Sequence, residues 1–207
     1  MIALIDYDAG NMKSVEKALQ LIREDVLVTR DPKEILAADK VVLPGVGSFG
    51  DAMENLHHFG LVPVIHQVVQ EQTPFLGICL GLQLLFEKSE ESPGVEGLGI
   101  LKGEILRIPA AEGLKIPHMG WNNIRFPNKG RLFAGVPEDA YVYFVHSYYL
   151  KAQDEKIVTA TTEYGTHIHA SVESGNLFAC QFHPEKSSHV GLQILKNFAK
   201  LEGKGGR

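Results

Sequence analysis

The feature that most constrains the fold of this chain is an alternation, in its first half, of short apolar segments with amphipathic helical patterns. Residues 2–6, 26–29, 41–43 and 75–78 are strand-like, and residues 11–23, 32–38, 48–72 and 80–87 are helical. Asp31 and Pro32 supply an N-cap and a first-turn proline for the second helical segment. Such alternation predicts right-handed crossovers between parallel strands. We therefore expect an α/β fold with a mostly parallel central sheet flanked by helices.

The second half of the chain has a different pattern. Between residues 98 and 183 apolar positions recur at period two, and turn residues at 124–130 and 173–176 separate the segments. We expect additional antiparallel strands and hairpins here, followed by a closing amphipathic helix over residues 187–201. No linker or repeat divides the chain, so residues 1–202 are predicted to form a single domain and residues 203–207 a flexible tail.

Composition and charge argue against several classes of function. The 207 residues are 44% hydrophobic with a formal net charge of −5, and no run of Lys or Arg offers a surface for nucleic acid. No apolar run is long enough to cross a membrane, and the first residues are strand-like and do not resemble a secretory leader. We expect a cytoplasmic protein that binds neither nucleic acid nor membrane, with both cysteines reduced.

Cys79 is the best candidate for a reactive atom. It stands in Gly77-Ile-Cys-Leu-Gly81, between a strand pattern and a helical one. The spelling Gly-x-nucleophile-x-Gly is typical of a strained strand-to-helix turn that presents a nucleophile, and the start of a helix favours a thiolate. A lone cysteine is, however, more often a small buried hydrophobic residue, which is our interpretation of Cys180. The assignment of Cys79 therefore depends on partners elsewhere in the chain.

The segment Gln181-Phe-His-Pro-Glu-Lys186 offers such partners. His183 and Glu185 are two residues apart, so their side chains would point the same way on an extended segment. Pro184 between them indicates the end of a strand. An isolated His-x-Glu is usually a solvated pair, but together with the Cys79 turn it predicts a triad in which Glu185 orients the base His183.

A glycine-rich loop, Pro44-Gly-Val-Gly47, directly follows another strand-like segment. Acyl transfer needs backbone N–H groups aimed at the developing oxyanion, and glycines supply them without obstruction. We expect the oxyanion hole at Val46 and Gly47, with the N–H of Leu80 as the second donor. Without the triad, the same loop would be an ordinary strand–helix connection.

These motifs, in this order, resemble those of the class I (triad) glutamine amidotransferases. More narrowly, Pro117-His-Met-Gly-Trp-Asn122, Tyr143-Phe-Val-His-Ser-Tyr148 and the segment 181–188 resemble the glutaminase subunits of imidazole glycerol phosphate synthases. The resemblance covers nearly the whole chain. One departure is Asp8, where the family more often has glycine. Because Asp tolerates a positive φ, we expect the turn at residue 8, between the first strand-like segment and the first helical segment, to be kept.

The resemblance implies a glutaminase reaction without a cofactor. Cys79 would attack the side-chain amide of L-glutamine to form a thioester, with His183 as acid and base and Glu185 holding the imidazole. The ends of glutamine would be held by Gln83, Glu91, Ser147 and Tyr148. Glu91 could equally be a solvated acid in an acidic run. His167 and His169 have a spacing that some metal sites use, but no third ligand accompanies them, so no metal is expected.

The resemblance also implies a partner, because the chain has no room for a domain that accepts ammonia. The partner would be a cyclase subunit with a (β/α)8 barrel, forming a heterodimer that produces imidazole glycerol phosphate and an aminoimidazole carboxamide ribotide in histidine biosynthesis. The expected contact residues are Asn11, Pro117, His118, Met119, Gly120, Trp121, Tyr143 and Lys186. Trp121 could instead fill the core. The glycine-rich loop suggests a form of regulation. Because Val46 lies between two glycines, its peptide could rotate. The oxyanion hole would then form only when the partner binds its substrate.

Other functions fit parts of this pattern. One alternative is the glutaminase of another synthase, such as anthranilate or pyridoxal phosphate synthase, although these tend to lack the Pro-His-Met-Gly-Trp-Asn stretch. A free-standing cysteine hydrolase or peptidase would need no partner. A catalytically silent regulatory subunit would not need an intact triad. Among the other histidines, we expect His57, His58, His66 and His189 at the surface and His146 in the core.

Overall fold

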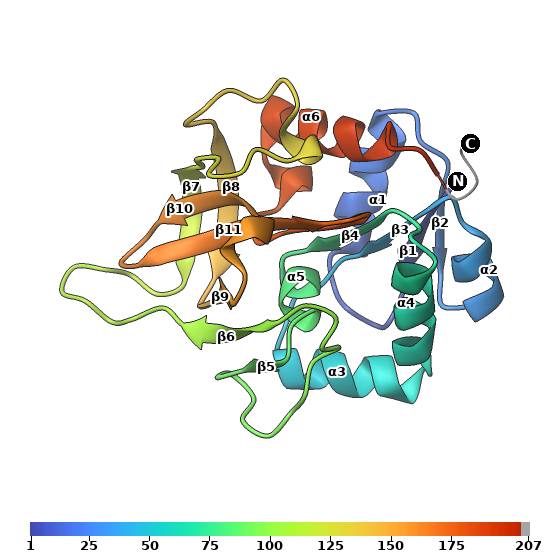
Figure 1. Ribbon diagram of the computed structural model, residues 1–207, viewed down its shortest axis with the longest axis horizontal. Helices are drawn as coiled ribbons and strands as arrows, with labels where there is room; N and C mark the ends of the chain where they lie inside the picture. The colour runs from blue at the N-terminus through green and yellow to red at the C-terminus, as the bar shows by residue number, and fades with distance from the viewer. Residues whose placement is uncertain (204–207) are drawn as a thin grey trace.

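The first half of the chain and one late strand form a parallel sheet. The structure is a computed structural model that describes residues 1–203, and the tail predicted over 203–207 lies outside it except for Gly203. The parallel strands are β1 (Ile2–Ile5), β2 (Val26–Thr29), β3 (Lys40–Leu43), β4 (Phe75–Ile78) and β12 (Leu177–Cys180), in the order β2-β1-β3-β4-β12 (Figure 1). The expected mostly parallel central sheet is thereby confirmed.

Antiparallel strands extend this sheet on the far side of β12. They are β5 (Lys88–Ser89), β6 (Gly103–Arg107), β9 (Tyr148–Ala152), β10 (Val158–Glu163) and β11 (His167–Ser174), and within residues 1–203 they complete a sheet of ten strands. Only the short β5 runs parallel to its neighbour β6. A separate hairpin-like pair is formed by β7 (His118–Asn123) and β8 (Tyr141–His146). The predicted antiparallel second half is confirmed.

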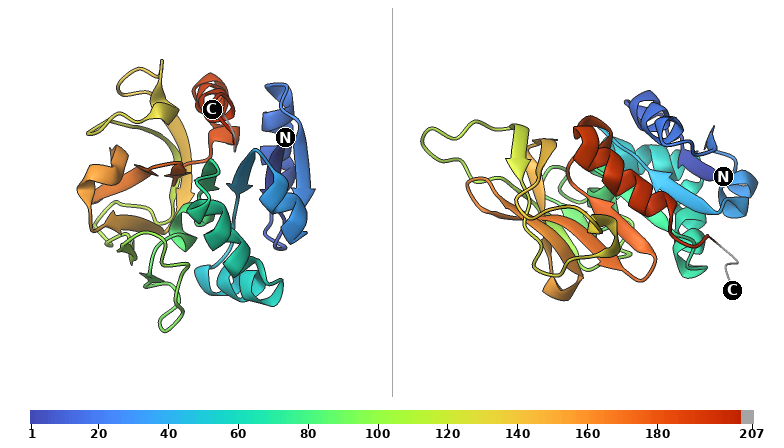
Figure 2. Two further views of the ribbon diagram at one scale, coloured as in Figure 1. Left: turned by 45° about the vertical axis from the view of Figure 1, so that its right-hand side comes forward. Right: turned by 90° about the horizontal axis from the view of Figure 1, so that it is seen from above.

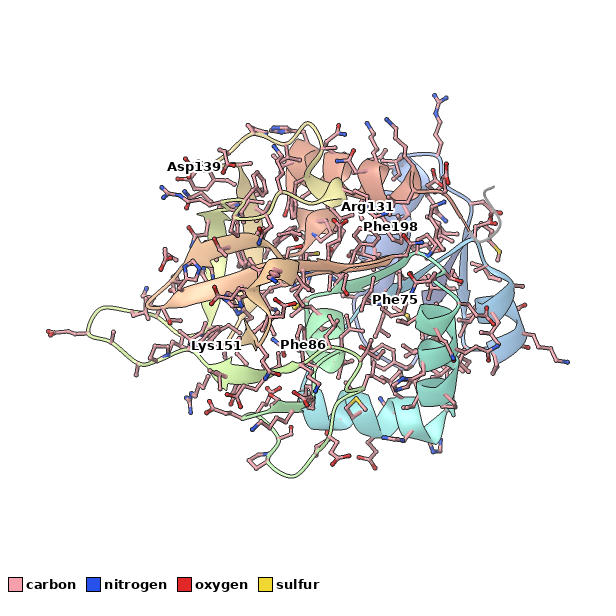
Figure 3. The ribbon with its side chains drawn as sticks, viewed as in Figure 1. Phe75, Phe86, Arg131, Asp139, Lys151 and Phe198 are labelled. Carbon is pink, nitrogen blue, oxygen red and sulfur yellow. The ribbon has the colours of Figure 1, made fainter. Side chains whose placement is uncertain are left out.

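Helices cover both faces of the parallel strands. Helices α1 (Met12–Leu21) and α6 (Ser188–Ala199) lie on one face, and α3 (Phe49–His58), α4 (Leu61–Gln70) and α5 (Leu80–Leu84) lie on the other, with α2 (Pro32–Ala37) beside α4 (Figures 1 and 2). Each face has its own buried cluster. Phe198 belongs to the cluster under α6, and Phe75 and Phe86 to the opposite one (Figure 3).

Two helical predictions were wrong in extent. The pattern over 48–72 forms two helices, because Gly60 takes a left-handed conformation (φ 65°) between them. Helix α5 ends at Leu84, before the expected residue 87. There the carbonyls of Leu84 and Leu85 accept hydrogen bonds from Leu98 (2.8 Å) and Ile100 (3.0 Å), which replace the next helical turn.

The two predicted turns had different outcomes. Within residues 173–176, Gly175 and Asn176 connect β11 to β12, with Gly175 at φ 58°, as expected for a hairpin turn. Residues 124–130, in contrast, begin a longer connection between β7 and β8 that includes a 3-10 turn, Arg131–Phe133. The pairing of the backbones of Arg125 and Thr161 ties this connection to β10.

The register of the sheet determines where the functional loops meet. Ile78 of β4 pairs with Cys180 of β12, and Gly77 pairs with Leu43 of β3. The residues that follow these strands therefore lie together at one edge, at the carboxyl ends of the parallel strands, where α/β folds bind ligands. In the part of the chain from residue 1 to 203, no helix has the length and apolar character needed to span a bilayer.

Candidate active site

Cys79 lies on a strained turn between β4 and α5. Its backbone has φ 55° and ψ −108°, a combination that residues with a side chain rarely adopt. The flanking glycines allow this turn because their backbones pack without room for a side chain. A Cβ on Gly77 would lie 2.8 Å from the carbonyl oxygen of Gly81, and one on Gly81 would lie 2.0 Å from that of Leu43. The expected strained strand-to-helix turn is therefore present, with glycine required on both sides.

His183 and Glu185 pair as expected, although the segment between them is not extended. The Nδ1 atom of His183 lies 2.8 Å from Oε1 of Glu185, and both side chains are buried. Residues Pro184–Lys186 form a 3-10 turn, so the expectation of an extended segment was wrong. The hydroxyl of Ser187 donates to the carbonyl of His183 at 2.6 Å and closes this turn. The turn, and not strand alternation, brings the two side chains together.

Asn11 supports the same carboxylate. Its Nδ2 donates to Oε1 of Glu185 at 3.0 Å, so one oxygen of Glu185 accepts from both Asn11 and His183. Asn11 itself has a left-handed backbone (φ 72°) ahead of α1. The turn that holds it also contains Asp8, whose φ of 62° matches the expectation for this departure from the family pattern. Arg30 bonds to Asp8 (2.6 Å) and Asp6 (2.8 Å) and fixes that turn.

The electrostatics of the site favour a charged imidazole. Burial alone would lower the pKa of His183, but its interactions with Cys79 and then with Glu185 outweigh burial and raise that pKa to about 9. The second ring nitrogen, Nε2, is buried and makes no hydrogen bond of normal geometry within residues 1–203. It is therefore the atom available for proton transfer between the thiol and a ligand.

Cys79 and His183 line one cavity of about 320 Å³, a size suited to a small ligand. The expected oxyanion residues Val46, Gly47 and Leu80 and the expected glutamine-binding residues Gln83, Glu91, Ser147 and Tyr148 all line it. Pro117, Val145 and His146 complete the wall. The structure thus gathers these residues from both halves of the sheet around the thiol.

The glycine-rich loop after β3 is anchored beneath this cavity. The hydroxyl of the buried Tyr7 donates to the carbonyl of Pro44 at 2.7 Å, and Gly45 packs so closely against Leu80 that a Cβ would lie 2.9 Å from it. Gly47 has a φ of 107°, which requires glycine, and Val46 is 36% exposed. The base of the loop is fixed, whereas its tip lies at the mouth of the cavity.

Two glutamine-site residues already have partners within the chain. Gln83 is buried and uses both of its Nε2 hydrogens, one to the carbonyl of Tyr148 (3.0 Å) and one to Oε1 of Gln181 (3.0 Å). Glu91 accepts from the N–H of Phe49 at 2.8 Å at the start of α3, so it is not merely a solvated acid. Only the carbonyl oxygen of Gln83 remains for a ligand.

Strand β7 separates the expected partner-contact residues into two sets. Met119 (63% exposed) and Trp121 (52%) face outward, so Trp121 does not fill the core. His118 was expected at the contact surface, but it is only 3% exposed, because alternate residues of a strand face opposite sides. It stacks between Phe144 and Tyr164. Pro117 and Lys186 are exposed, and Asn11, Gly120 and Tyr143 are half-buried.

The remaining histidines lie where the sequence indicated, with one addition. His57, His58, His66 and His189 are exposed and His146 is buried, but His146 also lines the cavity. Within residues 1–203 no three potential metal ligands are grouped. Sequence reasoning assigned no role to Gln181, which donates toward the Cys79 sulfur at 3.7 Å, although it begins the motif that contains His183.

A strained cysteine, a charged histidine and a glycine-rich loop on this fold define the class I glutamine amidotransferases, and the chain belongs to that family, whose sequence model matches residues 3–201. It is 56% identical over 200 residues to imidazole glycerol phosphate synthase subunit HisH of Moorella thermoacetica, covering 97% of this chain and 94% of that one. Identity to the HisH subunit of Methanocaldococcus jannaschii is 48%, over 97% and 100% of the two chains.

Solved structures share the fold at low sequence identity. A glutamine amidotransferase superposes with a TM-score of 0.74 at 18% identity, over 96% of this chain and 100% of that one. A glutamine amidotransferase of Thermotoga maritima gives 0.63 at 17% identity, over 96% and 81%. The architecture is therefore common to enzymes whose sequences have diverged widely.

Proposed function

We propose that this chain is the glutaminase subunit of imidazole glycerol phosphate synthase. It hydrolyses L-glutamine to glutamate and ammonia and passes the ammonia to a cyclase subunit. The observation that carries the proposal is the cavity that contains Cys79 and His183, in a chain about half identical to HisH subunits over nearly its full length. The free state of both cysteines fits a reducing compartment, and we place the chain in the cytoplasm.

The first half of the reaction forms a thioester. The Cys79 sulfur attacks the side-chain carbonyl carbon of glutamine, and the thiol proton resides on Nε2 of His183. The resulting oxyanion accepts hydrogen bonds from the N–H of Leu80 and from the Val46–Gly47 loop. His183 then gives its proton to the leaving nitrogen, and ammonia departs. A pKa of about 9 keeps His183 protonated at neutral pH, which suits this acid role.

The second half regenerates the enzyme. His183 is now neutral and accepts a proton from water, whose oxygen attacks the thioester carbon. The tetrahedral intermediate then collapses, the C–S bond breaks, and the proton on His183 returns to the sulfur as glutamate forms. Glu185, held by Asn11, keeps the imidazole oriented throughout.

The ammonia must reach its acceptor without entering water, where it would be protonated and lose its nucleophilicity. We propose that a (β/α)8-barrel cyclase subunit covers the cavity mouth and forms a heterodimer through Met119, Trp121 and Lys186 with their neighbours. Exposed Met119, Trp121 and Tyr141 fit such an interface, because large apolar side chains anchor protein contacts. The parts of this surface that lie beside the mouth are Pro117 and the Val46 loop.

The proposal is tested by incubating the chain with L-glutamine alone, with the cyclase subunit, and with the cyclase subunit and its ribulosyl substrate. Glutamate and imidazole glycerol phosphate are measured in each case. We expect glutamate release to depend on Cys79 and to rise with the partner and its substrate. Release that is equal in all three mixtures would favour a free-standing hydrolase, and no release in any of them would favour a regulatory subunit.

A further inference from the structure

Gln181 lies directly beside the nucleophile, one residue beyond β12. Its side chain is fully buried, and its Nε2 points at the Cys79 sulfur at a distance of 3.7 Å. The backbone N–H of Gln181 donates to Ala170 at 2.8 Å, which fixes the position of its Cα. At this distance the side-chain amide of Gln181 can form a hydrogen bond to the Cys79 sulfur, and such a bond is stronger when the sulfur is a thiolate.

The direction of this amide follows from its neighbours. The carbonyl of Tyr148 can only accept, so the group of Gln83 that faces it at 3.0 Å is the nitrogen. The same nitrogen has a second hydrogen, which it donates to Oε1 of Gln181. With its oxygen committed to Gln83, Gln181 presents N–H and not oxygen to the sulfur.

A buried histidine, His146, also contacts the Tyr148 carbonyl, and a second buried histidine, His118, contacts His146. Because that carbonyl only accepts, Nδ1 of His146, at 2.8 Å, carries a hydrogen. Burial lowers the pKa of His146 to about 3, so it is neutral and its Nε2 is an acceptor. Nε2 then accepts from Nδ1 of His118 at 3.0 Å, and Nε2 of His118 faces the side-chain nitrogen of Asn122 at 3.4 Å. Each hydrogen bond in this row therefore has only one possible donor.

We propose that Gln181 is a further catalytic residue, whose side-chain amide donates a hydrogen bond to the Cys79 sulfur and stabilises its thiolate. Gln83 and the Tyr148 carbonyl fix the direction of that amide, and His146 and His118 fix the carbonyl. This inference deepens the proposed function and rests on it. The reactivity of the Cys79 thiol can be measured without glutamine, so the inference and the proposed function can fail separately.

The test compares Gln181→Met, which keeps most of the volume but removes the donor, with the unaltered chain. Iodoacetamide alkylation of Cys79 is followed as a function of pH, with Cys79→Ala as the blank. Hydrogen bonds to charged groups are strong, so we expect alkylation at neutral pH to fall about tenfold and its midpoint to move about one unit higher. In the complex with the cyclase subunit, kcat for glutamate release should fall about tenfold while KM changes little.

Two further variants separate this role from a structural one. Ser171→Ala removes another fully buried hydrogen bond of the same strand pair, from Ser171 to the carbonyl of Ala179 at 2.7 Å, in which the Cys79 sulfur takes no part. It should lower stability but leave the alkylation profile unchanged. Gln181→Glu keeps the oxygen that accepts from Gln83 but places a second oxygen beside the sulfur. Its carboxylate should move the alkylation midpoint higher still.

Each possible result of these measurements either supports or overturns the proposed role of Gln181. An alkylation profile of Gln181→Met that coincides with that of the unaltered chain would overturn the inference. If that variant does not fold, the profile of Gln181→Glu decides in the same way. A loss of activity shared equally by Ser171→Ala would also overturn it. A shifted thiol profile in a chain that never releases glutamate would support the inference about Gln181 and reject the proposed function.

Discussion

The parallel half of the large sheet (β1–β4 and β12) and its antiparallel half, together with the β7–β8 pair, meet at the cavity but build it by different means. In the parallel half the backbone sets the geometry: Cys79 sits on a strained turn that two glycines permit. In the antiparallel half and the β7–β8 pair, side chains set it, through the hydrogen-bonded row of His118, His146 and Tyr148. The reactive atom is thus fixed by strain, and the wall that faces it by a neutral polar network.

The sharpest test of this division is removal of the reactive atom. Cys79→Ala should lower glutamate release by at least about a thousandfold, because a triad acts as a unit. Since Ala keeps the small side chain on the strained turn, the fold and binding to the cyclase subunit should be retained. Glutamate release and partner affinity, measured on the same sample, check both statements.

Cys180→Ala is the matched control for this loss. Cys180 is fully buried one residue before Gln181, and burial raises the pKa of its thiol well above the usual value. Its removal should cost stability, by about 1–2 kcal/mol, but little activity. If Cys180→Ala were as inactive as Cys79→Ala, the choice of nucleophile would be wrong.

The hydrogen-bonded row of His118, His146 and Tyr148 predicts that the protein loses stability in mild acid. Burial lowers the pKa of His118 to about 4 and that of His146 to about 3, against 6.5 for a free histidine. The unfolded chain therefore takes up protons that the folded chain refuses, and stability is lost as pH falls below 6.5 toward 4. For His118 the loss is at most about 3 kcal/mol.

His118→Phe keeps the stack against Phe144 and Tyr164 but cannot titrate. Urea unfolding at a series of pH values should give a shallower decline in the free energy of unfolding for this variant. The comparison is with His66→Asn, which removes an exposed histidine on α4 and should leave the decline unchanged. Equal slopes in all three chains would mean that His118 is not held neutral.

The same contrast between the parallel and the antiparallel half determines how much of the structure can be predicted from the sequence. The parallel strands, the Asp31 cap and the strained turn at Cys79 follow from local rules of apolar pattern and glycine placement, and all appear as expected. That β12 pairs with β4, and so brings His183 to the thiol, is a long-range pairing that no local pattern contains. It could be anticipated only from chemistry, because a nucleophile needs a base, and from the resemblance of the motifs to a known family.

The side-chain network was less accessible from sequence. His118 was placed at the partner surface because it lies in the Pro117–Asn122 motif, yet strand alternation turns it inward. The role of Asn11 beside Glu185, across 174 positions of sequence, could not be inferred from spacing. Polar residues in an antiparallel region can face either side of the sheet. The period-two pattern of the sequence therefore does not show which polar side chains contact one another.

The outer face of the β7–β8 pair should matter for binding and not for chemistry. Trp121 is 52% exposed and packs edge-on against Tyr143 at 6.1 Å. Trp121→Ala should weaken affinity for the cyclase subunit about thirtyfold, roughly 2 kcal/mol, as expected for an aromatic anchor. Calorimetric titration measures this. Leu21→Ala, a change at another exposed apolar residue (70%), on α1, should have no such effect. Equal affinity for Trp121→Ala and the unaltered chain would place the partner elsewhere.

The smallest expected effect separates the two roles that Asn11 could have. Asn11→Ala removes one neutral donor to Glu185, a hydrogen bond worth about 1 kcal/mol, while His183 keeps its own bond to that carboxylate. We expect kcat in the complex to fall about fivefold, with partner affinity nearly unchanged. Gln20→Ala, which breaks an exposed bond to Glu16 on the same helix, is the control and should change neither quantity. A loss of affinity with kcat preserved at saturating partner would show that Asn11 acts at the interface, and the parallel half would then contribute to binding as well as to the nucleophile.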